Sequence, residues 1–120
     1  MPQVLIAEDD GELRLVLAEM LTDRGVTVRQ AADGIQAAQI LKDDAGILLL
    51  VSDVKMPRMD GYTLIEEALG HNPELKVLMM TAYEERLPPA ALRAREIRVL
   101  PKPFELDAMC DRVIDMLARP

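Results

Sequence analysis

The feature that most constrains the fold is a run of five apolar residues, 47–51, that ends two residues before Asp53. An apolar run without alternation predicts a strand buried on both faces, as in a parallel sheet covered by helices. Pro57 and the pair Asp60-Gly61 follow, and these residues favour a short loop before the next helix. Asp53 is therefore expected at the carboxyl end of a central strand, where open α/β sheets bind ligands. A carboxylate there is a candidate nucleophile or metal ligand, although an aspartate that merely ends the strand or caps the next helix fits the same position.

The length of 120 residues predicts one domain spanning residues 1–120, large enough to bury a core without disulfides or metal. The single Cys110 cannot form an internal disulfide, which is typical of a reducing compartment. The chain lacks a signal pattern and the ~20-residue apolar run needed to span a bilayer, so we expect a cytoplasmic protein that does not enter membranes. The net charge of −7 argues against direct DNA binding.

The apolar spacing predicts five strands alternating with five helices. The expected strands are at 3–7, from 26 onward, 47–51, 75–80 and 97–100, and the expected helices are at 11–24, 33–42, 62–70, 89–95 and 105–118. The side chains expected to face the core include Leu13, Val16, Leu17, Met20 and Leu21 of the first helix. Such alternation predicts an α/β fold of the (βα)5 type, a doubly wound parallel five-stranded sheet with helices on both faces. The flavodoxin-like strand order 2-1-3-4-5 is the common small solution and places its crevice between the first and third strands.

In that order, Glu8 and Asp9 at the end of the first strand would lie beside Asp53. Two carboxylates ~5 Å apart repel by roughly 3 kcal/mol at an effective dielectric of 20, so three need a cation or a retained proton. Oxygen ligands without nearby His or Cys suit Mg²⁺. Thr81 and Lys102 end the fourth and fifth strands and add a hydroxyl and an ammonium at the same edge. These groups predict a site for a phosphoryl group on Asp53; an exposed acidic edge that binds nothing is the alternative.

Four motifs, IAEDD, VSDVKMPRMDG, MMTA and LPKPF, follow one another along the chain. At these residues the chain resembles the receiver domain of two-component response regulators, over essentially all 120 residues. The resemblance implies a switch rather than a conventional enzyme: Asp53 accepts a phosphoryl group from a phosphohistidine on a histidine kinase or phosphotransfer protein. It also implies that Mg²⁺ binds Glu8, Asp9, Asp53 and the backbone carbonyl of Lys55. Thr81 and Lys102 would sense the phosphate, and the domain would catalyse its own transfer and slow dephosphorylation.

The resemblance further implies a cis peptide bond between Lys102 and Pro103, and a downstream partner bound by helix 89–95, strand 97–100 and helix 105–118. Residues 86–102 carry a charge of +4 against −11 for the remainder, so we expect either an acidic partner surface or a merely solvated basic face. Val99 occupies the position where the family usually has a switching aromatic ring. Tyr83 is a hypothetical substitute for that ring, and simple partial burial is the alternative.

Two other functions fit parts of the pattern. A pseudo-receiver, which would be a constitutive protein-interaction module, is favoured only by Val99. A small Mg²⁺-dependent phosphohydrolase would use an aspartyl nucleophile but would want a second Asp where this chain has Lys55. A narrower similarity, in PELKVLMMTAY and VLPKPF, is to single-domain regulators that deliver substrates to a bacterial ATP-dependent protease. His71 is expected to be an ordinary surface residue.

Overall fold

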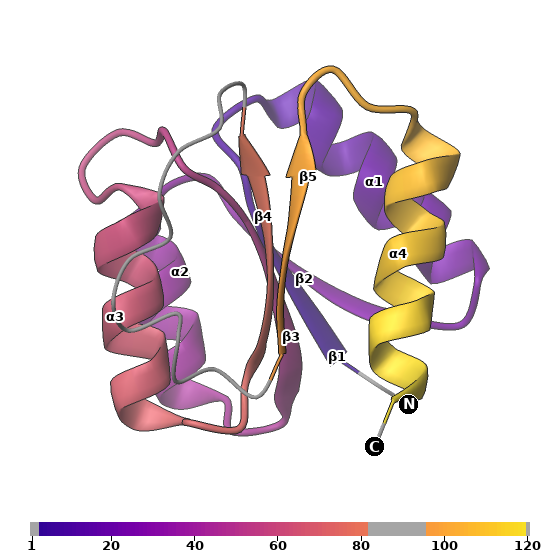
Figure 1. The fold of residues 1–120 in the computed structure, drawn as a ribbon. Helices are drawn as coiled ribbons and strands as arrows, with labels where there is room; N and C mark the ends of the chain where they lie inside the picture. The colour runs from indigo at the N-terminus through magenta and orange to yellow at the C-terminus, as the bar shows by residue number, and fades with distance from the viewer. Residues whose placement is uncertain (1–2, 82–95, 120) are drawn as a thin grey trace.

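The computed structural model describes residues 3–81 and 96–119 (Figure 1). Its elements are β1 (Gln3–Ala7), α1 (Gly11–Asp23), β2 (Thr27–Ala31), α2 (Gly34–Asp43), β3 (Ile47–Asp53), α3 (Gly61–His71), β4 (Lys76–Thr81), β5 (Glu96–Pro101) and α4 (Leu106–Ala118). All five strands run parallel in the order β2-β1-β3-β4-β5, which confirms the predicted flavodoxin-like topology. The expected helix at 89–95 and Tyr83 lie outside the described residues.

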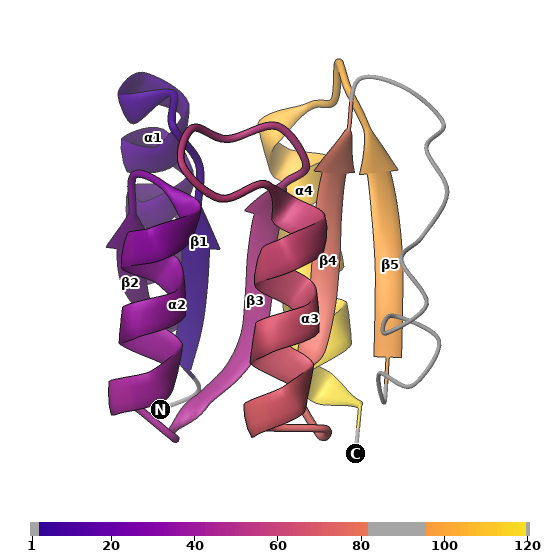
Figure 2. The same cartoon turned by 90° about the vertical axis from the view of Figure 1, so that its left-hand side faces the viewer.

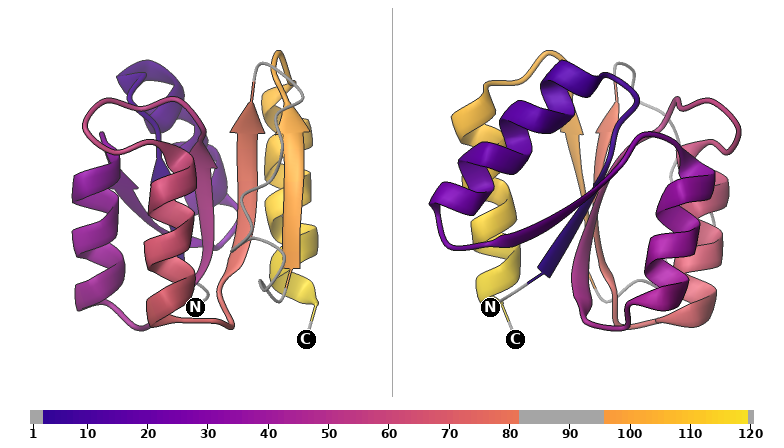
Figure 3. Two further views of the ribbon diagram at one scale, coloured as in Figure 1. Left: turned by 60° about the vertical axis from the view of Figure 1, so that its left-hand side comes forward. Right: turned by 180° about the vertical axis from the view of Figure 1, so that it is seen from behind.

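The sheet separates two layers of helices. Helices α1 and α4 cover one face, and α2 and α3 cover the other (Figures 1 and 2). Figure 3 shows α2 and α3 side by side on their face. Alternate residues of β1 point to opposite layers: Val4 packs with Leu17 and Met109, whereas Leu5 packs with Leu64. A strand with apolar residues on both faces is what the unbroken hydrophobic runs predict. Among the described residues, no helix is both long and apolar enough to cross a bilayer.

Two side chains expected in the core are exposed instead. The pairing of β1 with β3 has a bulge, because Gln3 pairs with Ile47 but Val4 pairs with Leu49. Leu48 is therefore left out of register and is 50% exposed, so the prediction of burial on both faces is wrong at this residue. In α1, Val16 is 37% exposed, and the buried face passes through Ala18 instead.

Aspartates begin three of the helices. Asp10 caps α1 and accepts hydrogen bonds from the backbone N–H groups of Glu12 and Leu13 at 3.1 and 3.2 Å. Asp33 and Asp60 cap α2 and α3 in the same way. Each carboxylate satisfies backbone donors that have no partner within the helix. The first turns of these helices are thereby fixed at the sheet edge where the strands end.

At the opposite edge, a buried lysine joins the sheet to α4. Lys76 is the first residue of β4 and is only 8% exposed. Its Nζ donates to the carbonyl oxygens of Met116 and Arg119, each at 2.5 Å. A buried ammonium requires such partners, and the carbonyls at a helix C-terminus carry partial negative charge. The contact anchors the end of α4 to the start of β4.

Candidate functional site

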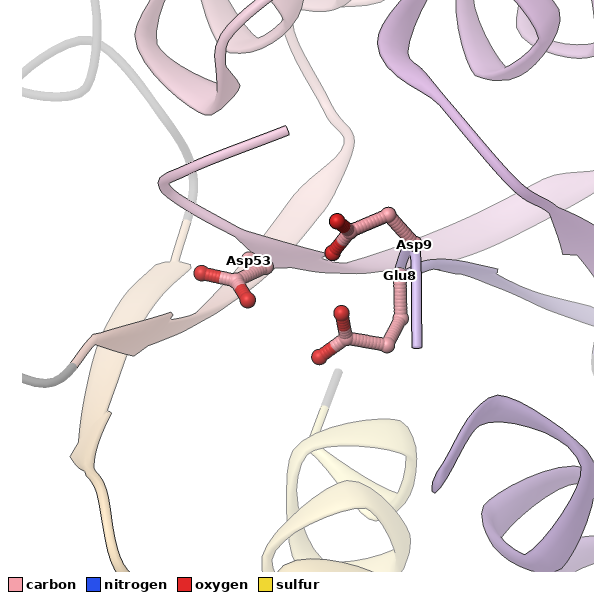
Figure 4. A group of neighbouring side chains, drawn as sticks. All are labelled: Glu8, Asp9 and Asp53. Carbon is pink, nitrogen blue, oxygen red and sulfur yellow. The ribbon is translucent and has the colours of Figure 1, made fainter. Parts of the chain in front are cut away.

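Three carboxylates meet where β1 and β3 end. Ala7 pairs with Ser52, so the next residues along the chain, Glu8 and Asp53, emerge at the same level of the sheet. Glu8, Asp9 and Asp53 each offer a carboxylate oxygen, and these oxygens lie within 4.8 Å of one another. Figure 4 shows the three side chains facing a common space; we call them the acidic cluster. Glu8 and Asp53 are buried and Asp9 is exposed, so the cluster opens to solvent on one side.

One ammonium group reaches the acidic cluster from the residue that follows β5. The Nζ of Lys102 lies 2.6 Å from Oδ2 of Asp53 and 3.3 Å from Oε1 of Glu8. Burial opposes the charge on Lys102, but the hydrogen bond to Asp53 and the charges of both carboxylates outweigh it and raise the pKa of Lys102. The backbone N–H of Lys102 donates to the carbonyl oxygen of Thr81 at 2.6 Å. The peptide bond to Pro103 is cis, which confirms what the family resemblance implied.

The second oxygen of Asp53 faces the loop that follows β3. The backbone N–H of Lys55 donates to Oδ1 of Asp53 at 3.1 Å. Gly61 closes this loop by donating its N–H to the carbonyl of Val54 at 2.8 Å. A Cβ at Gly61 would lie 2.4 Å from the backbone oxygen of Asp53, so a larger residue would displace the loop. This close packing holds the Lys55 backbone beside the acidic cluster.

The same loop also packs against α2. Gly34 is the first residue of that helix, and a Cβ there would lie 2.2 Å from the backbone oxygen of Met59. Position 34 therefore requires glycine because any larger residue there would collide with the loop. The position of α2 and the position of the loop beside Asp53 are thus linked.

The protonation of Glu8 depends on its burial and on its neighbours. Burial is the largest effect and raises the pKa of Glu8 to about 7; Asp9 and Asp53 also act to raise it, whereas the Asp10 N–H and Lys102 oppose the increase. A hard divalent cation would relieve the repulsion that remains after Lys102 has neutralised one charge. Oxygen donors without sulfur or imidazole are the set that Mg²⁺ prefers, so the acidic cluster fits that ion.

The structure brings the sequence-predicted residues to one edge of the sheet. Asp53 pairs with Met80 across β3 and β4, so Thr81 emerges next to it and is buried at the strand end. The acidic cluster, Lys102 and the backbone of Lys55 lie at the same edge. His71 is exposed at the far end of α3, as predicted.

Sequence reasoning missed Arg14. Its Nη1 donates to the backbone oxygen of Glu8 at 2.7 Å, and its Nε donates to Oε1 of Gln30 at 3.3 Å. Its position in the sequence was the signal that could have identified it, because Arg14 lies in the first turns of α1, shortly after the three consecutive acids at residues 8–10.

A shallow hollow of about 600 Å³ adjoins the acidic cluster. Its lining includes Asp9, Lys55, Met56 and Tyr62. The hollow lies between the exposed acid of the cluster and the loop after β3. It gives a ligand access to the cluster from solvent.

Comparison with known proteins gives consistent matches along the chain. The family model "Response regulator receiver domain" matches residues 4–114. The chain is 36% identical to sensor kinase CckA of Brucella abortus over 97% of its own length, but it spans only 12% of that kinase. It is 34% identical to response regulator receiver protein CpdR of the same organism, covering 98% of both chains. The crystal structure of response regulator TrrA from Thermotoga maritima, in complex with Mg²⁺-BeF, superposes with a TM-score of 0.80 at 25% identity, covering 97% of this chain and 99% of TrrA.

Proposed function

This chain belongs to the response regulator receiver domain family, and we propose that it is a phosphorylation-controlled switch whose phosphoacceptor is Asp53. The observation that carries the proposal is the position of the Lys102 ammonium, which contacts both Asp53 and Glu8 while Asp9 faces the same space. A buried carboxylate with a cation beside it, next to an exposed acid that lines a hollow, has the surroundings that phosphoryl transfer requires.

In the proposed reaction, an oxygen of Asp53 attacks the phosphorus atom of a phosphohistidine on the donor. The O–P bond forms as the N–P bond breaks, and the bonding pair stays on the imidazole nitrogen of the donor. Lys102 releases Asp53 and turns its ammonium toward the oxygens of the transferred group, which lie within the reach of the same side chain. Thr81 donates a hydrogen bond from its hydroxyl group to one of these oxygens.

The residues that would hold Mg²⁺ are the acidic cluster and the backbone carbonyl of Lys55. The ion, when bound, neutralises charge on the oxygens of the phosphoryl group. Support comes from the all-oxygen donor set and from TrrA, a relative whose structure contains Mg²⁺-BeF. The short loop that binds Asp53 through the Lys55 N–H keeps that backbone close to the cluster.

The phosphoryl donor is proposed to be a histidine kinase or a histidine phosphotransfer protein. Receiver domains accept phosphoryl groups from histidine kinases, and one relative of this chain is itself a sensor kinase. A downstream protein is proposed to bind the side of the domain that carries β5 and α4; residues 89–95, which were also expected to contribute, lie outside the described residues. On β5, Val99 is 38% exposed and supplies no aromatic ring, so a response at this position would not be the rotation of a ring.

The proposal is tested with beryllofluoride and Mg²⁺, followed by NMR of the backbone amides. We expect the spectrum to shift around Asp53 and Thr81, and the shift to be lost in Asp53→Asn. Asp33→Asn is the matched control, because it removes a carboxylate that caps α2 outside the acidic cluster and keeps a capping side chain. A folded protein that gives no response would support the pseudo-receiver and refute the switch. Sustained turnover of free phosphate esters would instead support a phosphohydrolase.

A further inference from the structure

The turn between β1 and α1 is held through the backbone of Glu8. Its N–H donates to the carbonyl oxygen of Ala31 at 3.1 Å, and its carbonyl oxygen accepts from Nη1 of Arg14 at 2.7 Å. Arg14 in turn donates its Nε to Gln30 at 3.3 Å. Ala31 and Gln30 both belong to β2, so both ends of Glu8 are fixed, directly or through Arg14, to the outer strand.

This arrangement bears directly on the acidic cluster because one peptide group joins two of its members. The carbonyl of Glu8 belongs to the peptide bond that leads into Asp9. If that peptide rotated, the Asp9 carboxylate would move relative to Asp53. The guanidinium of Arg14 opposes rotation because its planar fork binds the carbonyl and Gln30 at the same time. Without Arg14, the carbonyl would lose its partner in a partly buried turn.

We infer that Arg14 is a positioning residue that, together with Gln30, fixes the Glu8–Asp9 peptide in the orientation required for Mg²⁺ binding. The inference rests on the proposed function, since it concerns the same acidic cluster. Arg14 does not contact the ion; it acts through the backbone of Glu8. Residues that orient metal ligands commonly affect metal affinity by about tenfold or more.

The charge of Arg14 makes the test decisive. A guanidinium near a cation site repels the cation, so simple removal of the positive charge should tighten Mg²⁺ binding. Loss of positioning should weaken it. The two explanations therefore predict changes of opposite sign.

The experiment is calorimetric titration of the full chain with Mg²⁺ alone. We expect Arg14→Met to weaken binding about tenfold. Arg14→Lys should fall between this variant and the parent, because it keeps the charge and one donor but loses the fork. The matched control is Arg24→Met, which removes a guanidinium at the other end of α1, where Arg24 bonds Asp111 at 2.6 Å. Its Mg²⁺ affinity should equal that of the parent.

Gln30→Ala provides a second variant that leaves Arg14 and its charge in place. Gln30 is exposed, so this change should not endanger the fold, and binding should weaken several-fold. Parent-like or tighter binding in Gln30→Ala and in any folded Arg14→Met would overturn the inference while leaving the proposed function intact. A parent that binds neither Mg²⁺ nor beryllofluoride would overturn the proposed function and this inference together.

Discussion

The affinity for Mg²⁺ is expected to rise about tenfold between pH ~6 and pH ~8, because Glu8 must lose its proton to bind the ion. Burial and the neighbouring acids raise the pKa of Glu8 from 4.5 to about 7. At a pH one below that pKa about one molecule in ten has the carboxylate, and at a pH one above it about nine in ten. A carboxyl group that kept a pKa of 4.5 would be ionised across the whole range and would give no such dependence.

The same pKa sets the sign of a change in stability without metal. The folded state holds the Glu8 proton more tightly than the unfolded state does. The resulting stabilisation is fully present below pH 4.5 and is lost as the pH rises through about 7. It is at most about 3–4 kcal/mol, because each tenfold difference in proton affinity between the two states corresponds to ~1.4 kcal/mol. Saturating Mg²⁺ should reverse the loss, because the ion binds the ionised cluster of the folded protein.

The affinity should be measured by calorimetric titration at constant ionic strength, across this pH range. Glu8→Gln is the matched variant, because its amide keeps an oxygen ligand but does not titrate. Whatever affinity remains in that variant should be nearly independent of pH. An unchanged parent affinity between the two pH values would refute the reasoning, as would a Glu8→Gln variant that kept the tenfold dependence.

Three further predictions concern stability and can be checked by chemical denaturation. Lys102→Met removes the cation from the acidic cluster, so Mg²⁺ should raise the unfolding free energy more in this variant than in the parent; an equal increase would count against the contacts of Lys102. Gly34→Ala should lower the unfolding free energy by about 1–3 kcal/mol, because the added Cβ would collide with Met59. Gly70→Ala is the control: it has open space around it and should raise the unfolding free energy by up to about 1 kcal/mol. Equal effects of the two substitutions would contradict the contact between Gly34 and Met59. Asp10→Ala should cost about 1 kcal/mol and Asp10→Ser much less, since serine still caps α1; equal losses would show that the cap contributes little.

The sheet and most of the site could be predicted from the sequence because a strand end is marked by a simple local pattern. Apolar runs followed by polar residues located Glu8, Asp53 and Thr81, and parallel topology then required them to share one edge. Asp53 was predicted at the carboxyl end of the third strand and is the last residue of β3; the apolar run 47–51 stops two residues short of that end because Ser52 and Asp53 also pair with β4.

The features that sequence could not predict depend on contacts between distant segments. Leu48 is exposed because of a bulge in the pairing of β1 with β3, which no local pattern records. Arg14 donates to the backbone oxygen of Glu8. Every residue has such an oxygen, so the sequence does not show which of them an arginine will bind. Glycine at position 34 is explained by the nearby Met59 backbone, in a loop that is remote along the chain.

The buried lysine in β4 has a mechanical consequence. A β-strand is almost fully extended, at ~3.3 Å per residue, so the distance between the two ends of β4 is nearly fixed. Thr81 is the last residue of β4, and Lys76, the first, donates hydrogen bonds to carbonyl oxygens at the C-terminal end of α4. Because β4 is also paired with β3 and β5, the last turn of α4 is tied to the interior of the sheet, and α4 cannot slide along its own axis without breaking the two hydrogen bonds of the Lys76 ammonium.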